Sequence, residues 1–332
     1  MSFNTSVAHQ SKVYHEKTTL DIVCYTIIVL LGTTGNSVVI WVAGVLLKPS
    51  INNVWLINLA VADLIFCMTH MTSLIKIFIG YWPFGDFMCK LKGFLMYANM
   101  FCSVFLLAVI SVDRVICVWC PIFTRKRRTL FAARLISLGV WIVAVIFSSP
   151  NLAFWKVSLG KNNSSKCSLK EEVRDSETDS AKYFTYIRFF CGFLFPFMVI
   201  FICYTLAAIG IRRTRFSGKS RPLRILALLV FAFFLCWAPY HILRLNKLLN
   251  NKYNTSGLWH MATNLAYFNS CVNPVLYFCM GLNLRRRSGQ SLLGIFHRAL
   301  KEEGQILSQN TITDECSSRP LSLELEPVSP PC

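Results

Sequence analysis

The stretch of the chain with the clearest chemical potential is AVISVDRVICVWCP, Ala108 to Pro121, where Asp113 and Arg114 stand side by side in an apolar, helix-compatible run. A charge buried at the centre of a bilayer is costly, so an ionisable pair in such a run is a functional-site hypothesis by default. The arginine head can reach the inner membrane surface, and the aspartate can hold it there in an ion pair. We therefore expect a latch whose arginine is released when the inner ends of the helices separate. The alternative is a snorkelling charge at a helix end.

Other apolar segments also carry polar residues. If the segments cross the membrane side by side in alternating directions, these residues lie at comparable depths in it. Hydrocarbon offers no water, so such groups must find partners and should converge inside the protein. A carboxylate with nearby amide and hydroxyl oxygens is a set of hard ligands that could hold a hydrated monovalent cation. Hydrogen bonds that only hold the bundle together are the alternative, but the formal charge of Asp63 favours the cation site. The set comprises Asn36, Asp63, Asn99, Ser103, Asn269 and Asn273.

Prolines interrupt four of the apolar segments. Each removes a backbone hydrogen bond and can kink its helix. Two of them stand in motifs, with Trp237 shortly before Pro239 in CWAPY and Asn273 directly before Pro274 in NPVLY. Taken singly each is a packing feature, whereas together they indicate helices that can pivot within a packed core. The four are Pro150, Pro196, Pro239 and Pro274.

The elements that must position these residues are membrane-spanning helices. Of the 332 residues, 54% are hydrophobic and only 15% are charged, a balance too apolar for a soluble globule of this size. A helix of about 20 residues crosses a hydrocarbon core of roughly 30 Å. We expect an all-α membrane protein, a bundle of seven transmembrane helices at Leu20 to Leu46, Val54 to Ile79, Met88 to Val118, Leu135 to Trp155, Tyr183 to Ile211, Leu223 to Leu248, and Leu258 to Met280.

Positive charge indicates the orientation, because cytoplasmic loops hold an excess of Lys and Arg. Such residues follow the first, third, fifth and seventh segments, so the N-terminus is expected outside. This layout accounts for most of the net charge of +18 and makes a nucleic-acid partner unnecessary. It predicts a multi-pass protein of the plasma membrane. The glycosylation sequons fall on predicted external segments, with acceptors Asn4, Asn162, Asn163 and Asn254.

Two of the 14 cysteines are expected to form a disulfide. Most of the others lie in the predicted spans, where cysteine is a small buried hydrophobe. Cys89 and Cys167 lie instead on the oxidising outer side, where disulfides persist. Their pairing would tie the loop at residues 156–182 over the mouth of the bundle.

The chain is predicted to form one helical domain with short flanks. Residues 1–19 are an extracellular N-terminus and residues 20–282 the transmembrane bundle. Residues 283–300 have an apolar face surrounded by basic residues, which predicts an amphipathic cytoplasmic eighth helix in the inner headgroup layer. Residues 301–332 are rich in Ser, Thr, Pro and Glu and are predicted to be a disordered cytoplasmic tail.

Taken together, these residues resemble a known family. From Leu20 to Leu300 the chain resembles rhodopsin-like G-protein-coupled receptors, and the motifs that carry the resemblance occur in that family's order and approximate spacing. They are Gly35-Asn36, NLAVAD (58–63), Cys89, DRV (113–115), Trp141, Cys167, Pro196, Tyr204, CWAP (236–239) and NPVLY (273–277).

Within that family the chain most resembles the chemoattractant receptors, which include the formyl-peptide, chemerin and anaphylatoxin receptors. The resemblance rests on WPFGDFMCK (82–90), NMFCSVFLLAVISVDR (99–114) and SRPLRIL (220–226). It implies an extracellular peptide or small acidic ligand and coupling mainly to inhibitory G proteins.

The resemblance also implies roles for the residues singled out above. The polar set without Asn36 would form a sodium pocket whose occupied state favours inactivity; no other cofactor is expected. Trp237 and Phe233, with Pro196 and Val104, would form a connector that repacks on ligand binding. Tyr204 and Tyr277 would swing toward Arg114 when the sixth helix moves outward. Such a switch works only if ligand and G protein prefer the same conformation. The switch residues are Asp113, Arg114, Tyr204, Phe233, Trp237, Pro239, Asn273, Pro274 and Tyr277.

The chain departs from the family pattern in three ways. Val115 stands where the family usually has Tyr, which removes a hydroxyl near the G-protein contact. Lys219 stands where some members place an acid that binds the arginine, so a second latch of that kind cannot form. Formyl-peptide receptors carry an acid on the third helix and two arginines on the fifth, whereas the corresponding positions here are Tyr97, Phe184 and Arg188.

Arg188 is the strongest candidate for a ligand contact. It lies about two turns outward of Pro196, or roughly 12 Å at 1.5 Å per residue, which is the depth of a pocket. An unpaired guanidinium there is costly and favours a ligand carboxylate as its partner. An intrahelical pair or a water-filled vestibule is the alternative. The other candidates for ligand binding are Tyr97, His241, Arg244 and Lys247.

Three other classes compete with a signalling receptor. Val115 favours a non-signalling or arrestin-biased decoy of the same fold, which binds and internalises ligand. A transporter predicts internally repeated halves, which the sequence does not show. An enzyme is least favoured, since no nucleophile-base pair or metal-ligand cluster stands at a workable spacing.

Serines and threonines among acids at residues 308–322 could be phosphorylated to recruit arrestin.

Overall fold

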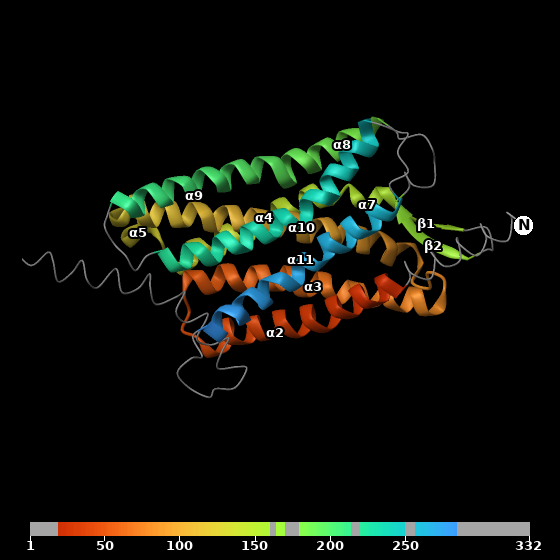
Figure 1. The fold of residues 1–332 in the computed structure, drawn as a ribbon, viewed down its shortest axis with the longest axis horizontal. Helices are drawn as coiled ribbons and strands as arrows, with labels where there is room; N and C mark the ends of the chain where they lie inside the picture. The colour runs from red at the N-terminus through yellow and green to blue at the C-terminus, as the bar shows by residue number, and fades with distance from the viewer. Residues whose placement is uncertain (1–18, 160–163, 170–178, 214–219, 250–255, 284–332) are drawn as a thin grey trace, which may run out of the picture.

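The computed structural model describes residues 19–159, 164–169, 179–213, 220–249 and 256–283. Over these ranges long helices lie side by side as a bundle, with a small sheet at one end and the short helix α5 at the other (Figure 1). The elements are η1 (Ile28–Gly32), α2 (Thr33–Trp41), η2 (Val42–Leu46), α3 (Ile51–Ile79), α4 (Gly85–Trp119), α5 (Pro121–Arg127), α6 (Leu130–Ser148), α7 (Asn151–Phe154), β1 (Trp155–Leu159), β2 (Ser165–Leu169), α8 (Asp179–Phe189), η4 (Phe190–Leu194), α9 (Phe195–Arg213), α10 (Ser220–Leu249) and α11 (Ser256–Asn283).

Among the described residues, six helices are long and apolar enough to cross a membrane. Their bounds are Thr19–Leu46, Ile51–Ile79, Gly85–Trp119, Leu130–Phe154, Lys182–Gly210 and Leu226–Leu249. The 28-residue helix α11 packs against α10, α2 and α3 and is the seventh rod of the bundle. The predicted seven-helix architecture is therefore confirmed.

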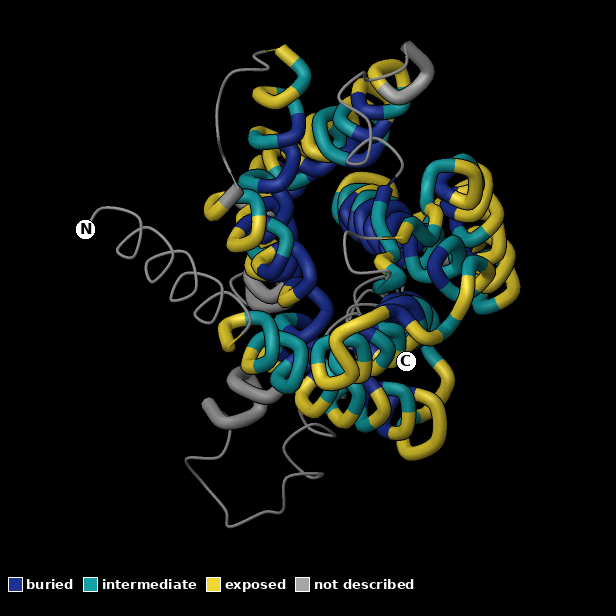
Figure 2. The backbone as a smooth tube through the Cα atoms, turned by 90° about the vertical axis from the view of Figure 1, so that its right-hand side faces the viewer, coloured by how far each residue is buried: buried dark blue, intermediate teal, exposed yellow. Residues whose placement is uncertain are grey.

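The bundle exposes large apolar side chains and buries polar ones within a mostly apolar core. Figure 2 shows the buried parts of the chain facing the middle of the bundle and the exposed parts facing outward. Large apolar side chains such as Phe131, Phe201 and Phe231 are exposed on the outside, where lipid chains are suitable neighbours. Fully buried polar side chains such as Asp63 and Asn36 lie within. An apolar exterior around buried polar groups is the pattern of a protein whose solvent is lipid.

Local sequence sets where the spans begin and end. Ser50 caps the N-terminus of α3, since its side chain accepts a hydrogen bond from the backbone of Asn53 at 3.2 Å. Gly80 ends the same helix in the left-handed conformation, with φ of 85°, which glycine adopts without steric cost. Thr129 caps α6 in the same way as Ser50, accepting from the backbone of Ala132 at 3.1 Å.

The fifth span changes its winding directly before a proline. Residues Phe190–Leu194 form a π-helical turn, and Pro196 follows in α9. Because proline lacks an N–H, it cannot donate to the carbonyl four residues earlier, and wider turns of this kind accommodate the gap. The kink expected at Pro196 thus takes the form of a local π-turn.

The structure adds four elements that the sequence patterns did not predict, namely α5, α7, β1 and β2. The fourth span was expected to run to Trp155 and ends at Phe154, but a turn at Pro150 divides it into α6 and α7, and Trp155 begins strand β1. The loop expected between residues 156 and 182 contains an antiparallel hairpin of β1 and β2. Helix α5 follows α4 directly, because Pro121 is suited to the first turn of a helix.

Several predictions concern residues outside the described ranges. They are the N-terminus before residue 19, the eighth helix at 283–300 apart from Asn283, which ends α11, the tail at 301–332, Lys219, and the sequons at Asn4, Asn162, Asn163 and Asn254.

The hairpin is fastened to the outer end of α4. The backbone N–H of Trp82 donates to the carbonyl of Ser165 at 2.8 Å, and the backbone of Val157 donates to Asp86 at 3.0 Å. Trp155 packs so closely on Gly93 that a Cβ there would lie 2.2 Å from its ring. Glycine at this position therefore lets the hairpin seat on the helix.

Replacing this glycine should unseat the hairpin. We expect Gly93→Ala to lower the stability of the purified protein by about 1 to 3 kcal/mol, because the added methyl group overpacks a buried contact. Gly139→Ala is the matched control, since a Cβ there meets nothing within 4 Å and alanine favours the helix. Thermal unfolding in micelles measures both. Equal midpoints for the two variants would contradict the proposed role of Gly93.

Candidate functional site

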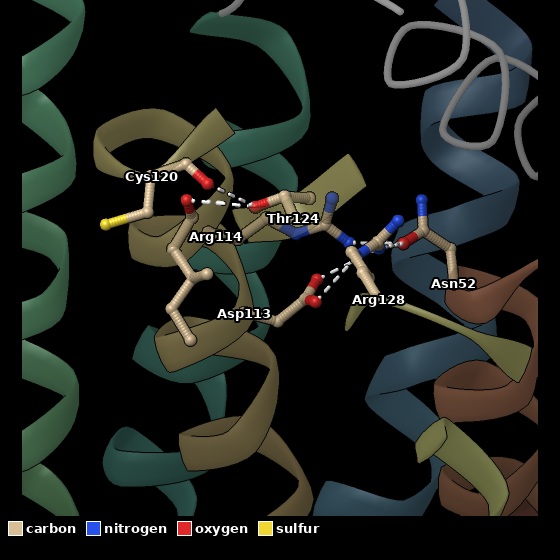
Figure 3. A network of polar contacts seen from close by, with 7 residues as sticks. Asn52, Asp113, Arg114, Cys120, Thr124 and Arg128 are labelled. Atoms are coloured by element: carbon tan, nitrogen blue, oxygen red, sulfur yellow. Dashed lines mark hydrogen bonds and ion pairs between the residues drawn. The ribbon is translucent and has the colours of Figure 1, made fainter. Parts of the chain in front are cut away.

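The charged pair at the inner end of α4 has different partners from those expected (Figure 3). Asp113 binds Arg128, the residue directly after α5: Nε donates to Oδ1 at 2.7 Å and Nη2 donates to Oδ2 at 3.0 Å. Two parallel bonds from one guanidinium to one carboxylate make a strong and orientation-specific ion pair. The ion pair expected between Asp113 and Arg114 is therefore not the one that forms, because Arg128 occupies both carboxylate oxygens.

A neutral acceptor holds Arg114 instead. Its Nη2 donates at 2.8 Å to Oδ1 of Asn52 on α3, and Arg128 donates to the same oxygen at 3.0 Å. The Arg114 side chain is 5% exposed, and its Nε and Nη1 have no hydrogen-bond partner among the described residues. One shared amide oxygen thus restrains the arginine at the inner end of the bundle.

Helix α5 sets the position of Arg128. The backbone N–H of Arg128 donates to the carbonyl of Thr124 at 3.0 Å, and the Thr124 hydroxyl donates to the carbonyls of Ile116 and Cys120. Burial disfavours the Arg128 charge, but the hydrogen bond and the charge of Asp113 outweigh it and raise the pKa of Arg128. The guanidinium therefore stays charged, and it is anchored to α4 through α5.

Deeper in the bundle, Asp63 on α3 gathers donors from two other helices. Nδ2 of Asn99 on α4 donates to Oδ1 at 2.9 Å, and Nδ2 of Asn273 on α11 donates to Oδ2 at 2.7 Å. Ser270 donates to Oδ1 of Asn99 at 3.3 Å. Asp63 is wholly buried, so these amides supply the hydrogen bonds that water would donate to an exposed carboxylate.

The other members of the polar set lie nearby but differ in their bonding. Ser103 is buried one turn after Asn99 on α4, and its Oγ has no hydrogen-bond partner among the described residues. Asn269 is buried on α11, and no hydrogen bond among the described contacts joins it to Asp63. Asn36 donates to the carbonyl of Ser270 at 3.0 Å and thereby ties α2 to α11. Its role is structural in this conformation.

The expected switch residues occupy the inner half and centre of the bundle. Phe233 and Trp237 are buried on α10 with ring centroids 6.2 Å apart. Tyr277 is buried on α11, and Tyr204 is half-buried on α9. Their swing toward Arg114 concerns a second conformation and stays a prediction. The remaining two, Pro239 and Pro274, lie inside α10 and α11.

Arg188 lies buried in the outer half of the bundle, bonded only to neutral groups among the described residues. Its Nη1 donates to the Tyr97 hydroxyl at 3.1 Å and its Nη2 to Oδ1 of Asn151 at 2.6 Å. The guanidinium also lies 4.1 Å from the centroid of the Tyr97 ring, a cation–π distance. Tyr97 is in turn 2.7 Å from the hydroxyl of Tyr240. The partners lie on α4 and α7, so the expected alternative of an intrahelical pair does not apply.

Two further candidates share this region. His241 is buried and packs against Phe193 with ring centroids 4.9 Å apart. Arg244 is buried one turn further along α10, with its guanidinium 5.9 Å from the centroid of Trp259. Lys247 is exposed at the outer end of the helix. The outer half of the bundle thus presents two buried guanidinium groups among aromatic rings.

A disulfide holds the hairpin over this region. Cys89 at the outer end of α4 is bonded to Cys167 on β2, with their Cα atoms 5.6 Å apart. This pairing is the expected one. It fixes β2 above the outer end of α4, the helix that also carries Tyr97.

Reasoning from the sequence missed four residues that complete these sites. Asn52 and Arg128 share the inner network, Ser270 supports the Asp63 site, and Asn151 binds Arg188. The signal for Ser270 was present, since it lies one turn before Asn273 on the same helix face. Arg128 belongs to a basic run that the positive charge of inner loops explains equally well, so its pairing was hidden.

Comparison with known proteins places the chain in a defined group. The family "7 transmembrane receptor (rhodopsin family)" matches residues 35–277. N-formyl peptide receptor 3 of Pongo pygmaeus is 34% identical, over 87% of this chain and 88% of that protein. The C3a anaphylatoxin chemotactic receptor of Danio rerio is 36% identical, over 90% of this chain and 82% of that protein. Formyl peptide receptor 2 of Mus musculus is 35% identical over 92% of each chain.

The Asp63 site makes a prediction about two neighbouring side chains on α4. Asn99→Ala removes a donor to a buried carboxylate and should lower stability by about 1 to 3 kcal/mol. Ser103→Ala removes a hydroxyl that bonds no described residue and should be close to neutral in sodium-free buffer. Thermal unfolding in choline chloride compares the two variants. A larger loss for Ser103→Ala than for Asn99→Ala would show that the bonding around Asp63 is not as described.

Proposed function

The chain belongs to the rhodopsin family of seven-transmembrane receptors, and we propose that it transmits the binding of an extracellular peptide or other acidic ligand to inhibitory G proteins. It is a multi-pass plasma-membrane receptor of the chemoattractant-like kind. Its family is one of receptors and not a class of enzymes. The ligand chemistry, the G-protein class and the arrestin partner belong to the proposal.

The observation that carries the ligand proposal is the bonding of Arg188. Within the described part of the chain, Arg188 is 3% exposed, and its guanidinium bonds a phenol and an amide but no carboxylate. A buried cation without a counter-charge is costly, and a ligand carboxylate would supply one. Arg244 is buried among aromatic rings in the same half of the bundle and would add a second positive charge. An acidic ligand fits this site best.

The relatives support the same chemistry. Their names describe receptors for formyl peptides and for the C3a anaphylatoxin. We carry over from them only the class of an extracellular peptide ligand. Arrestin is the second cytoplasmic partner that we propose, recruited by phosphorylated serines and threonines at residues 308–322, which lie outside the described residues.

Sodium is a further proposed effector, held at Asp63. The donor set fits, because a wholly buried carboxylate stands with a buried Ser103 hydroxyl that bonds no described residue. Asp63 and Ser103 would supply oxygen ligands, and Oδ1 of Asn99 would be a third. A bound cation would neutralise Asp63 and so stabilise the packing in which the ion is held.

Ligand recognition by Arg188 can be tested with acidic agonists. In a screen of acidic peptides and lipid mediators, Arg188→Ala should lower the potency of a hit by about tenfold or more, because a charge-assisted hydrogen bond contributes about 1.5 to 3 kcal/mol. Converting the ligand carboxylate to an amide should cost potency on the native receptor and little on Arg188→Ala. Agonist-stimulated nucleotide exchange on inhibitory G protein is the measurement.

Arg134→Ala provides the matched control, since Arg134 is an exposed arginine on α6 and is not a ligand-binding candidate. An agonist indifferent to Arg188→Ala would refute the anchor. Surface binding without any nucleotide exchange would favour the second candidate, a non-signalling or arrestin-biased decoy, which the valine at position 115 supports.

The sodium proposal predicts a salt-specific gain in stability. At equal ionic strength, NaCl should stabilise the protein relative to choline chloride by about 1 kcal/mol once Na⁺ reaches about five times its Kd. Asp63→Asn should abolish the difference, and Ser103→Ala should reduce it while leaving the stability in choline chloride unchanged. An equal response of Asp63→Asn and native protein would exclude Asp63 as the ligand. Thermal unfolding midpoints provide the measurement.

A further inference from the structure

We infer that Arg128, which lies outside the family motifs, is a positioning residue that competes with Arg114 for its acceptors and so keeps Arg114 weakly held. The inference rests on the proposed signalling function, because it concerns the readiness of the inner face to open.

The first step is the occupation of Asp113. Arg128 uses both carboxylate oxygens, at 2.7 and 3.0 Å. The side chains of Arg128 and Asp113 are only 20% and 13% exposed, so water screens the pair little. While this pair stands, Arg114 must compete with Arg128 for the carboxylate, and among the described contacts it makes no hydrogen bond to Asp113.

The second step is the sharing of Asn52. Its single Oδ1 accepts from Arg114 at 2.8 Å and from Arg128 at 3.0 Å (Figure 3). Because this oxygen accepts a hydrogen bond from each of two guanidinium groups, the two groups compete for it. Removing Arg128 would therefore free two acceptors at once, the carboxylate of Asp113 and the amide oxygen of Asn52. Both changes would hold Arg114 more tightly.

The third step is the link to α5. The backbone of Arg128 closes the last turn of this helix. Ile122 and Phe123 are exposed on α5, and with Lys126 and Arg127 they line an open cavity of about 490 Å³. A partner seated on α5 would therefore act on Arg114 through the position of Arg128. The loop is part of the switch and not a passive connection.

The test uses the full chain in lipid nanodiscs with two readouts. One is hydrogen exchange in the inner part of α10, residues 226–233, and the other is basal nucleotide exchange on inhibitory G protein. Arg128→Gln should slow both, the basal rate by about fivefold or more if the coupling lies in the usual range for linked sites. Arg128→Lys keeps the cation and should restore much of the native behaviour. Arg134→Gln removes an exposed cation of α6 that does not line this cavity and should change neither readout.

Two further variants distinguish competition from simple damage. Asp113→Asn added to Arg128→Gln should reverse the loss, because the carboxylate that captures Arg114 is gone. Asn52→Asp offers Arg114 a charged acceptor and should slow both readouts even with Arg128 present. Thermal unfolding midpoints close to the native value show that each variant is folded.

Faster or unchanged exchange in Arg128→Gln would overturn the inference, as would a double variant that stays as slow as Arg128→Gln. If the expected pattern appears in hydrogen exchange while native protein and all variants fail to promote nucleotide exchange, the competition stands and the proposed signalling function fails. The two claims therefore fail separately.

Discussion

The interior of this receptor is governed by one constraint: hydrocarbon supplies no water and no counter-charge, so the chain must satisfy its own buried polar groups. Asp63 meets the constraint with amides from two other helices. Arg188 meets it with a phenol and an amide, and leaves its charge uncompensated among the described residues. Arg114 meets it with one shared oxygen. The three sites differ in how completely they satisfy the constraint: both oxygens of Asp63 accept hydrogen bonds, whereas Arg114 and Arg188 keep donors that bond no described residue.

One rod passes all three sites. Helix α4 carries Tyr97 beside Arg188, Asn99 at Asp63, and Arg114 at the inner face. From Tyr97 to Arg114 the helix rises by about 25 Å at 1.5 Å per residue, and it is closely packed throughout this length. Packed helices move between discrete arrangements rather than deform continuously. A ligand that shifts the packing at the outer end can therefore change the bonding at Asp63 and Arg114 without touching either.

The sequence predicted the rods and the residues that cannot be exposed to lipid. Apolar length and positive charge defined the spans, and the compartment of Cys89 and Cys167 defined their disulfide. What it could not predict was partner choice. Arg114 is next to Asp113 in the chain and Arg128 is 15 residues away. Arg128 binds Asp113 because helix α5 brings it back to α4. The hairpin was missed although Trp155–Leu159 alternates apolar and polar residues as a strand does, because the expected fourth span included Trp155 and the residues after it were expected to form a loop.

Whether Asp113 binds Arg114 or Arg128 decides how strongly Arg114 is held at the inner end of the bundle. Breaking a buried ion pair by removing one member costs about 3 to 5 kcal/mol, whereas coupling between two sites in one protein is typically about 1 to 3 kcal/mol. A direct pair between Asp113 and Arg114 would therefore hold the arginine more strongly than a neutral amide oxygen does. By engaging Asp113 and sharing Asn52, Arg128 leaves Arg114 with a hydrogen bond to a neutral acceptor. In the proposed switch, an arginine that no family motif contains thus weakens the hold on Arg114.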